Sequence, residues 1–372
     1  MKILYISRLD GRPWAGPTYS VPKQIEAQNK VDDVLWFNII KGSKSEWRET
    51  ITNWKEREYY LDLDDVPSGK ISSLPKPFDN PELVVVEQCY PFAISTVLLE
   101  LLLHQYNYIV VPRGELTKQA QNKSRLKKII ANALIYKLWA KKACAIQYLT
   151  KDEADTSQGW NNKGIILPNG TDIPVNINLS FNTNKIACIS VGRISVVHKG
   201  IDLLIDACAT VKEEMKAANC TVEIYGPDVE NKVSELEKIV LQNGLDQIIH
   251  FHDGVYGTEK DKIIRSADCF IMTSRFEGQP TSLLEALSYG VPCLVTNGSH
   301  MRKEIEHANA GWGADNTVES ISIALKQMVK DRDSFSEKGR NARLLANRYS
   351  WDVIAQKSHI EYEKLLGERN NG

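Results

Sequence analysis

The sequence predicts an α/β protein made of two doubly wound domains, each a parallel sheet covered by helices on both faces. Short runs rich in apolar and β-branched residues alternate with segments of helical apolar spacing along nearly the whole chain. The 372 residues are enough for two or three domains, and the expected strands are too many for one compact domain of average size. These observations favour two sheets in succession.

The expected strands form two groups along the chain. The first group comprises residues 2–7, 34–38, 83–88, 108–111, 145–150 and 164–168. The second group comprises residues 185–191, 221–225, 248–252, 268–274 and 292–296. Apolar residues at a helical period separate several of these runs, as in residues 201–215 and 233–243. Residues 41–80 are charged and irregular, and no element is predicted there.

A polar, asparagine-rich stretch near residues 171–184 separates the two groups of strands. It has no helical period, and its composition suits a linker between domains. We therefore expect a first domain over residues 1–172, a linker over 173–184 and a second domain over 185–348. Residues 349–372 are expected to form an amphipathic C-terminal helix that packs back on the first domain.

Composition excludes several classes of protein. A formal net charge of −1 gives no electrostatic footprint for nucleic acid, so we expect no nucleic-acid partner. The seven cysteines form no Cys-x-x-Cys pair, which predicts reduced, buried thiols and no metal site built from them. The absence of a signal segment and of an 18-residue apolar run favours a cytoplasmic protein. No G-x-G-x-x-G motif is present, so no dinucleotide cofactor is expected.

The strongest constellation of polar residues follows the expected strand at 268–274. A glycine-containing loop leaves the carboxyl end of this strand and leads into a helix that is expected to start near Pro280. Open α/β sheets bind ligands at such strand ends, and free amides at a helix N-terminus favour a phosphate. The candidate binding residues of this turn are Gly278, Gln279, Pro280, Thr281 and Ser282.

Two glutamates in the same segment have different reach. Glu277 lies in the loop, where its carboxylate can accept hydrogen bonds from sugar hydroxyls, and Glu285 lies about one turn into the helix, within reach of a second diol. Alternatively, Glu277 is a solvated loop residue, and Glu285 closes a capping box with Ser282. Taken together, after a buried strand and before a Gly-Val-Pro turn, the two acids favour a ligand site.

The segment S-R-F-E-G-Q-P-T-S-L-L-E-A-L-S-Y-G-V-P, which contains Glu277 and Glu285, resembles the signature of family 4 retaining glycosyltransferases. Further matches follow in order through most of the chain. They are Asn169-Gly170, Gly192-Arg193-Ile194, Lys199-Gly200-Ile201-Asp202, Tyr225-Gly226-Pro227 and Tyr349-Ser350-Trp351. The resemblance implies the GT-B fold, in which two Rossmann-like domains face a cleft and a C-terminal helix crosses back.

The resemblance also implies roles for particular residues. Arg193 and Lys199 would hold the diphosphate of a nucleotide-sugar donor, Glu285 its ribose, and Glu277 the transferred sugar. Fixed cations and helix amides aimed at a leaving diphosphate stabilise the transition state and can replace a divalent metal, so none is expected. For Arg193 and Lys199 the alternative is an exposed ion pair. The acidic triplet Asp62-x-Asp64-Asp65 is interpreted as solvated surface. Gly192, Gly226 and Asn169 complete the expected binding set.

Two features of the first domain remain open. Arg113, in a Pro-Arg-Gly segment after a strand, is a candidate catalytic residue near the phosphate or acceptor, or else a turn residue with a local salt bridge. Many family members have a histidine in this region. The first strand-to-helix loop, expected over residues 8–20, contains Gly16 as a candidate substrate contact, although a generic loop is an equal alternative.

A basic segment runs from Lys118 to Lys142 and contains eight cations, no acid and interleaved apolar residues. It is either a core helix with a solvated basic face or a surface for an anionic membrane. The pair His250-x-His252 has no third ligand in sequence and favours strand-end packing over a metal site.

The resemblance to family 4, together with the charged residues above, implies a retaining glycosyltransferase. It would move a hexose-type sugar from a nucleotide-diphosphate donor, UDP favoured over GDP, to a glycan or lipid-linked glycan in surface polysaccharide biosynthesis. It would act in the cytoplasm or peripherally on the inner face of the membrane. A second hypothesis is another GT-B enzyme, a sugar-nucleotide epimerase or a phosphorylase. A third hypothesis is a non-catalytic protein that binds nucleotide sugars.

Overall fold

The computed structural model describes residues 1–12, 15–41, 57–90, 95–122, 125–157, 159–175, 177, 181 and 184–370. The chain divides into two compact units. Unit 1 comprises Met1–Gly170 together with Trp351–Gly372, and unit 2 comprises Thr171–Ser350. The expected linker over 173–184 falls partly outside the described residues. Each unit contains one parallel sheet with helices on both faces, so the predicted doubly wound α/β architecture is confirmed.

Unit 1 is built on a sheet of seven parallel strands in the order β3-β2-β1-β4-β5-β6-β7. The strands are β1 (Lys2–Ser7), β2 (Asp33–Asn38), β3 (Tyr60–Asp62), β4 (Leu83–Glu87), β5 (Tyr108–Val111), β6 (Ala145–Tyr148) and β7 (Gly164–Ile166). Successive side chains of β1 enter two different cores, with Leu4 and Ile6 on one face and Ile3 and Tyr5 on the other. The strand sequences are continuously apolar because both faces of the sheet are covered.

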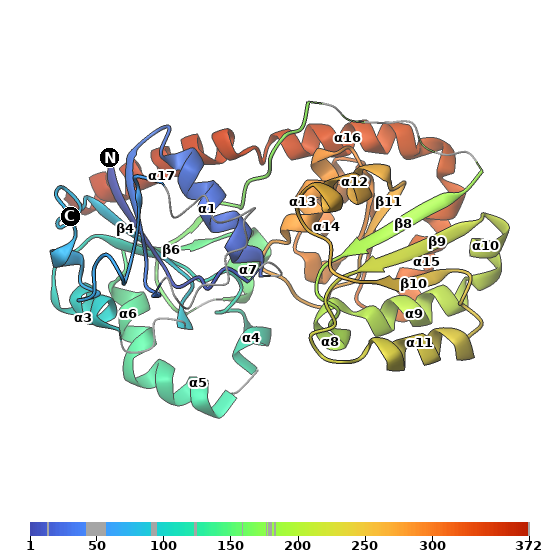
Figure 1. Cartoon of the computed structure of the whole chain (residues 1–372), viewed down its shortest axis with the longest axis horizontal. Helices are drawn as coiled ribbons and strands as arrows, with labels where there is room; N and C mark the ends of the chain where they lie inside the picture. The colour runs from blue at the N-terminus through green and yellow to red at the C-terminus, as the bar shows by residue number, and fades with distance from the viewer. Residues whose placement is uncertain are drawn as a thin grey trace. The chain divides into compact units, whose positions relative to one another are not determined.

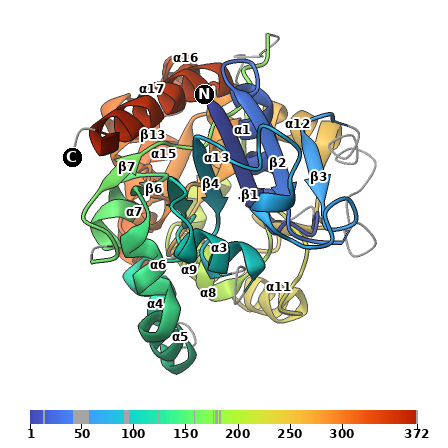
Figure 2. The ribbon, with the colours of Figure 1, turned by 90° about the vertical axis from the view of Figure 1, so that its left-hand side faces the viewer.

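Helices cover both faces of the unit 1 sheet (Figures 1 and 2). They are α1 (Gly16–Gln28), α3 (Thr96–Leu103), α4 (Lys118–Asn122), α5 (Arg125–Ala131), the π-helical turn η4 (Asn132–Tyr136), α6 (Lys137–Lys142), α7 (Lys151–Thr156) and α17 (Trp351–Asn370). A short 3-10 turn, η2, spans Ile71–Ser73. Within the described residues, no helix combines the length and the apolar character that crossing a membrane requires.

The C-terminal helix α17 packs against α1 and against one face of the unit 1 sheet. The Tyr362 hydroxyl donates to Gln147 Oε1 at 2.7 Å, and His359 Nδ1 lies 2.8 Å from Asp32 Oδ1. Trp351 lies against Gly170, where an added Cβ would come within 2.2 Å of the indole ring. Contacts between such distant parts of the sequence explain why α17 belongs to unit 1.

Unit 2 is built on six parallel strands in the order β10-β9-β8-β11-β12-β13. The strands are β8 (Ile186–Val191), β9 (Cys220–Tyr225), β10 (Ile249–His252), β11 (Cys269–Met272), β12 (Cys293–Thr296) and β13 (Gly311–Ala314). Cys269 and Ile271 of β11 enter one core, and Phe270 and Met272 enter the other. All seven cysteines of the chain are free thiols, and six of them are buried, as the sequence predicts.

The helices of unit 2 connect its strands and cover both cores. They are α8 (Val196–Lys199), α9 (Ile201–Thr210), α10 (Lys212–Ala217), α11 (Val233–Gln242), α12 (Gly257–Ser266), α13 (Thr281–Ser288), α14 (Arg302–His307), α15 (Val318–Lys330) and α16 (Phe335–Asn347). Two 3-10 turns, η5 (Asn297–Ser299) and η6 (Arg332–Ser334), complete the unit. The helix expected over 201–215 is interrupted at Val211, which separates α9 from α10.

The structure contains two strands that the sequence does not predict, and it corrects the expectations for Asp62 and for the length of the first strand-to-helix loop. β3 is a three-residue edge strand within a charged region, and β13 contains two glycines, so neither has a strong strand pattern. Of the acidic triplet, Asp64 and Asp65 are exposed as expected, but Asp62 is buried as the last residue of β3, where its Oδ1 accepts from the Asp64 amide. The first strand-to-helix loop is shorter than the predicted 8–20, since α1 begins at Gly16.

Candidate functional site

The candidate site of unit 2 lies where the carboxyl ends of β8, β9 and β11 meet. β8 is flanked by β9 on one side and by β11 on the other, so the strand order reverses direction here. Open parallel sheets bind ligands outside the strand ends at such a reversal. The loops after these three strands, together with the helices α8 and α13 that follow β8 and β11, contain most of the predicted site residues, from Gly192 to Glu285.

Lys199, the last residue of α8, and Glu277, in the loop after β11, form an ion pair. The Nζ of Lys199 lies 2.6 Å from Glu277 Oε1, and the two side chains are only 16% and 13% exposed. The Ser274 hydroxyl donates to the same Oε1 at 2.8 Å. The structure therefore brings together a predicted phosphate-binding cation and a predicted sugar-binding acid, and the solvated alternative for Glu277 is wrong.

The electrostatics of Glu277 keep it ionised. Burial by itself would raise the pKa of this carboxyl, but the charges of Lys199 and His198 and the hydrogen bonds from Lys199 and Ser274 outweigh it and hold the pKa below its usual value. His198 Nδ1 lies 3.8 Å from Glu277 Oε1, and its ring packs edge-on against Phe276. The site thus has a fixed anion and a fixed cation side by side.

Close backbone packing positions this pair. Gly200 follows α8 with a φ of +65°, and a Cβ on it would lie 2.2 Å from the Thr273 carbonyl oxygen, so only glycine fits. The Thr273 hydroxyl donates to the carbonyls of Lys199 and Gly200 at 3.2 and 3.0 Å. On the other side of the loop, Arg275 makes two hydrogen bonds to the carboxylate of Asp202, at 2.8 and 2.7 Å.

The loops after β8 and β9 pack closely against each other at Gly192, Arg193 and Gly226. A Cβ on Gly226 would lie 1.8 Å from the carbonyl oxygen of Gly192, and a Cβ on Gly192 would lie 3.3 Å from Lys199 Nζ. Arg193 is exposed and makes no hydrogen bond or ion pair with the described part of the chain, so the ion-pair alternative does not hold for it. Its guanidinium is available to an anion.

We expect Gly226→Ala to destabilise the protein by about 1–3 kcal/mol, because the new methyl group forces the backbone of one loop to move. Donor affinity should fall as well, since the displaced loop contains Gly192, which packs against the side chain of Lys199. Urea unfolding and nucleotide titration measure the two effects. Gly367→Ala is the control, because its Cβ would meet no atom within 4 Å and helix α17 should be stabilised by about 0.5–1 kcal/mol. Equal stability of Gly226→Ala and the parent chain would contradict the packing argument.

The N-terminus of α13 faces the same strand ends. Pro280 is the N-cap, the helix begins at Thr281, and no side chain of the described residues caps it. The capping-box alternative for Ser282 and Glu285 is therefore wrong, and the first amides of the helix lack a partner from a capping side chain. Gln279 is buried with its amide near the sulfur of Met301, and His300 Nδ1 lies 3.3 Å from the Gly278 carbonyl oxygen.

Glu285 is held by a lysine that the sequence analysis did not identify. Lys260, on α12, places its Nζ 2.8 Å from Glu285 Oε1, while Glu285 Oε2 is buried with no hydrogen-bond partner among the described residues. Burial raises the pKa of Glu285 above its usual value, and the charge and hydrogen bond of Lys260 oppose this rise only in part. An orphaned carboxylate oxygen is an acceptor site for a ligand hydroxyl.

Four residues of this site, His198, Ser274, Lys260 and His300, carried no sequence signal strong enough to single them out. His198 is the direct neighbour of Lys199, and Ser274 ends the strand before the motif, so both lie inside segments already selected. Lys260 and His300 belong to other helices and turns, and only the fold brings them to Glu285 and Gly278.

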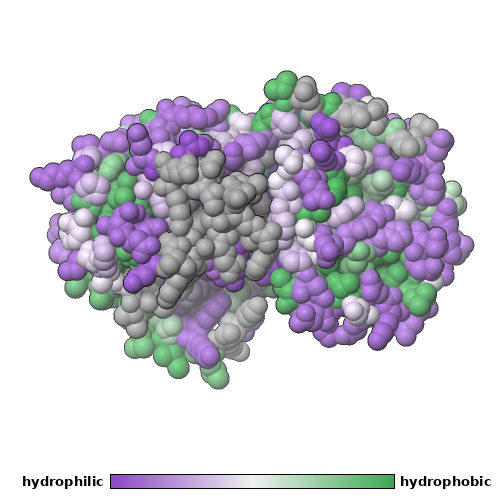
Figure 3. Space-filling view, viewed as in Figure 1, coloured by the Kyte–Doolittle hydropathy of each residue, from purple (hydrophilic) through white to green (hydrophobic). Residues whose placement is uncertain are grey.

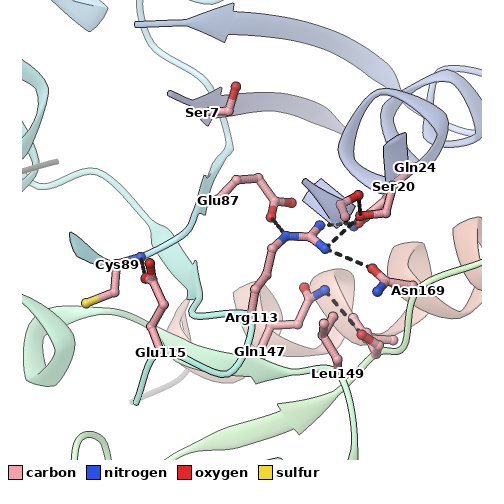
Figure 4. Close-up of polar contacts among 12 residues, drawn as sticks. Ser7, Ser20, Gln24, Glu87, Cys89, Arg113, Glu115, Gln147, Leu149 and Asn169 are labelled. Carbon is pink, nitrogen blue, oxygen red and sulfur yellow. Dashed lines mark hydrogen bonds and ion pairs between the residues drawn. The ribbon is translucent and has the colours of Figure 1, made fainter. Parts of the chain in front are cut away.

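Arg113 lies at the carboxyl end of the unit 1 sheet, buried in a network of its own unit (Figure 4). Its Nε lies 2.6 Å from Glu87 Oε2, and the two side chains are 5% and 0% exposed. Its terminal nitrogens donate to Ser20, Gln24 and Asn169 at distances of 3.1, 3.2 and 2.8 Å. The alternative of a local salt bridge therefore describes the observed contacts, and Asn169 serves the same network.

Buried carboxylates fix the loop that contains Arg113. Arg113 and Gly114 both have positive φ, at 50° and 86°. Glu153 accepts from the amides of Gly114 and Leu149, and Glu115 accepts from the amides of Cys89 and Tyr90. Burial is the main cause that raises the pKa of Glu115 and of Glu153. The network holds Arg113 in an unusual backbone conformation.

The remaining predicted contacts are simpler. Gly16 is the exposed first residue of α1, and no atom lies within 4 Å of a Cβ built on it, so nothing in the described fold requires glycine there. His250 and His252 both pair with Glu223, at 3.1 and 2.7 Å, as strand-end packing predicts. Within the described ranges, no group of three histidine, cysteine or acidic side chains is arranged to hold a metal ion.

The two parallel sheets place this chain in the GT-B fold. Sucrose-phosphate synthase from Thermosynechococcus elongatus superposes with a TM-score of 0.69 at 14% identity, over 99% of this chain and 100% of that one. HepE from Anabaena, solved in complex with UDP, gives 0.69 at 15% identity, over 98% and 100%. Likenesses at this level of identity show the fold alone.

The C-terminal half of the chain resembles a known sequence family. Residues 176–344 match the family described as glycosyl transferases group 1. Mannosylfructose-phosphate synthase of Agrobacterium fabrum is 26% identical over 178 residues, which are 45% of this chain and 38% of that protein. The D-inositol 3-phosphate glycosyltransferase of an Arthrobacter strain is 24% identical over 191 residues, 51% of this chain and 45% of that protein. The chain thus spans less than half the length of these relatives.

Proposed function

We propose that this protein is a retaining glycosyltransferase that moves a hexose-type sugar from a nucleotide diphosphate to a hydroxyl of a glycan or a lipid-linked glycan. The observation that carries the proposal is the buried pair Lys199–Glu277 at the strand ends of unit 2, beside the exposed Arg193 and the N-terminus of α13. The match of residues 176–344 to the glycosyl transferases group 1 family supports the reaction class. Surface polysaccharide biosynthesis is the proposed context.

The charges of the site suit a nucleoside diphosphate as leaving group. Departure of the sugar leaves additional negative charge on the diphosphate, and fixed cations with helix amides stabilise that charge without reorganisation. In the proposed site Arg193 and Lys199 contact the diphosphate together with the amides of residues 281–283. Glu277 accepts from hydroxyls of the transferred sugar and orients Lys199. No metal is needed for charge neutralisation.

Glu285 suits the ribose of the donor. Its Oε2 is a buried, unpartnered acceptor, and Lys260 fixes its other oxygen. A carboxylate held in this way can accept hydrogen bonds from a vicinal diol. UDP is the favoured nucleotide, since HepE of similar fold was solved with UDP and with UDP-glucose. GDP remains a second candidate.

Binding and turnover test the proposal directly. UDP-, GDP- and ADP-sugars are compared by the rise in melting temperature, because a ligand that binds the folded state raises apparent stability. Turnover is then followed with a panel of glycan and lipid-linked acceptors, and NMR of the product gives the anomeric configuration. No shift with any of the three nucleotide classes would reject the donor site, and an inverted product would reject retention.

The same experiment separates the competing functions. A sugar-nucleotide epimerase would convert the donor without an acceptor, and a phosphorylase would require inorganic phosphate. A non-catalytic binding protein would show the melting shift but no turnover with any acceptor. Release of nucleoside diphosphate that depends on a carbohydrate acceptor is expected for the transferase alone.

Lys260→Met tests how Glu285 is held. Because Lys260 lowers the pKa of Glu285, its removal should raise that pKa further, and donor binding needs the ionised carboxylate. The acid limb of the pH profile of kcat/KM should therefore move to higher pH. The pKa of Glu277 is lowered from its usual value, whereas that of Glu285 is raised, so we expect Glu285 to set the acid limb.

Lys262→Met is the matched control for this measurement. Lys262 lies on the same helix α12, is exposed and makes no hydrogen bond or ion pair with the described residues. Its variant should keep the pH profile of the parent enzyme. An acid limb that stays in place in Lys260→Met would show that Lys260 does not act through the charge of Glu285.

A further inference from the structure

Unit 1 carries an exposed apolar ridge along its most basic segment. Among the described side chains of α5, η4 and α6, five large aliphatic ones are more than half exposed and form the ridge: Leu126 (78%), Ile129 (52%), Ile130 (61%), Leu134 (76%) and Leu138 (53%). Both ribbon views draw α5 projecting from the sheet of its unit, and apolar surface appears there in Figure 3. Large aliphatic side chains grouped in this way mark an interaction surface.

The helical spacing explains why these side chains cannot reach the core. Leu126, Ile130, Leu134 and Leu138 recur at intervals of four residues, which places them along one face. Buried side chains of the same segment belong to another set of positions: Asn132, Tyr136, Trp139 and Ala140. Trp139 stacks on Tyr108 of the sheet. Because these four buried residues already pack the helices against the sheet, the side chains of the ridge are free to contact a partner.

Charge identifies the kind of partner. Residues 116–151 contain no aspartate or glutamate, and Lys127, Lys137 and Lys141 lie exposed beside the ridge. Lys128 is engaged differently, since its Nζ donates to the Ala120 carbonyl at 2.6 Å. Aliphatic side chains flanked by lysines fit a surface that is apolar inside and negatively charged outside, as an anionic lipid bilayer is.

We propose that the ridge docks unit 1 on an anionic membrane surface, with its leucines and isoleucines among the acyl chains and its lysines at the lipid phosphates. This contact does not involve the donor site. It would place the proposed transfer reaction at a membrane surface. A basic amphipathic helix lies in the plane of such a surface, and the ridge occupies the outward face of its helices.

Vesicle sedimentation with the full chain tests the proposal. The protein should pellet with vesicles of phosphatidylcholine and phosphatidylglycerol at 70:30 (about one anionic lipid in three) and remain in solution with pure phosphatidylcholine. Leu126→Glu/Leu134→Glu should lower the bound fraction by roughly tenfold or more. Lys137→Gln/Lys141→Gln should weaken binding by roughly fivefold for each lysine, and salt should weaken binding of the parent chain in the same way.

Ile323→Glu/Leu344→Glu is the matched control, since these side chains of unit 2 are 62% and 64% exposed and lie outside the ridge. It should bind vesicles like the parent chain, and all variants should keep the parent melting temperature and donor-induced shift. Equal binding of the ridge variants and the control, or no binding by the parent chain, would overturn the proposal. A parent dimer that Leu126→Glu/Leu134→Glu dissociates would assign the ridge to a second copy instead. The donor-induced shift is read without vesicles, so failure here leaves the transferase proposal standing.

Discussion

Replacing Glu277 by glutamine is expected to lower kcat by about 10²–10³-fold, a loss of about 3–4 kcal/mol of transition-state stabilisation. Glutamine keeps the shape of the side chain but removes the charge that faces Lys199 at 2.6 Å. It also turns one acceptor oxygen into a donor, so the sugar and the lysine both lose a partner. Steady-state kinetics with the donor identified by the binding screen measure the change.

The split between kcat and KM identifies what Glu277 does. A contact that strengthens in the transition state lowers kcat, whereas uniform binding of the donor changes KM alone. Lys199→Met should give a loss of similar size, and the double variant should lose less than the sum, because the two groups act as a unit. Losses that add fully would contradict a functional pair.

Glu214→Gln provides the control for disrupting an ion pair. Glu214 pairs with Lys326 at 2.7 Å on the surface of the same unit, and both side chains are 43% exposed. This variant should keep the kinetics and the melting temperature of the parent enzyme, because exposed ion pairs contribute little. Full activity of Glu277→Gln, with Glu214→Gln unchanged, would remove Glu277 from the mechanism.

Arg113→Met is expected to destabilise unit 1 by about 3–5 kcal/mol. The substitution leaves Glu87 fully buried without the cation that lies 2.6 Å from it, and it removes the donors to Ser20, Gln24 and Asn169. Urea unfolding followed by tryptophan fluorescence measures this change. Described tryptophans of unit 1 are Trp36, Trp139, Trp160 and Trp351, while unit 2 contributes Trp312, so the signal reports mainly on unit 1.

A double variant distinguishes a buried pair from a substrate contact. Arg113→Met/Glu87→Leu removes both charges and should recover much of the lost stability, because two apolar residues leave no uncompensated charge. Arg113→Lys keeps the charge but loses the branched contacts to Ser20, Gln24 and Asn169, so it should fall between the parent and Arg113→Met. Loss of transfer with unchanged stability in Arg113→Met would instead support a direct role in catalysis.

The sequence predicted much of the fold because its strands are continuously apolar and its helices keep a regular period. All eleven of the segments expected as strands form strands, and each has a recognisable local pattern, as the run from Cys269 to Met272 illustrates. The three-residue β3 and the glycine-containing β13 were missed, since their stability comes from neighbouring strands and not from their own side chains. The start of α1 at Gly16 was likewise not predicted, because the N-cap residue, Ala15, has no capping side chain.

The sequence also predicted one part of the candidate site, while another part needed the tertiary structure. The turn from Glu277 to Glu285 lies within a single strand–loop–helix segment, so its residue types and spacing were sufficient to identify it. Sequence alone could not decide between a ligand site and a capping box for Glu285, because both use the same residues. The choice followed from Lys260, which lies on α12 and occupies one oxygen of the carboxylate.

By itself, the sequence determined the α/β class, the family resemblance and the segments that carry charge, because these depend on neighbours along the chain. Tertiary structure decided which charges meet. The pairing of Lys199 with Glu277 across 78 positions, and of Arg113 with Ser20 across 93, requires parallel strands that end at one edge of a sheet. The order of the strands brings their carboxyl ends together. Burial there excludes water, so charged side chains that lie close together form ion pairs and hydrogen bonds with one another.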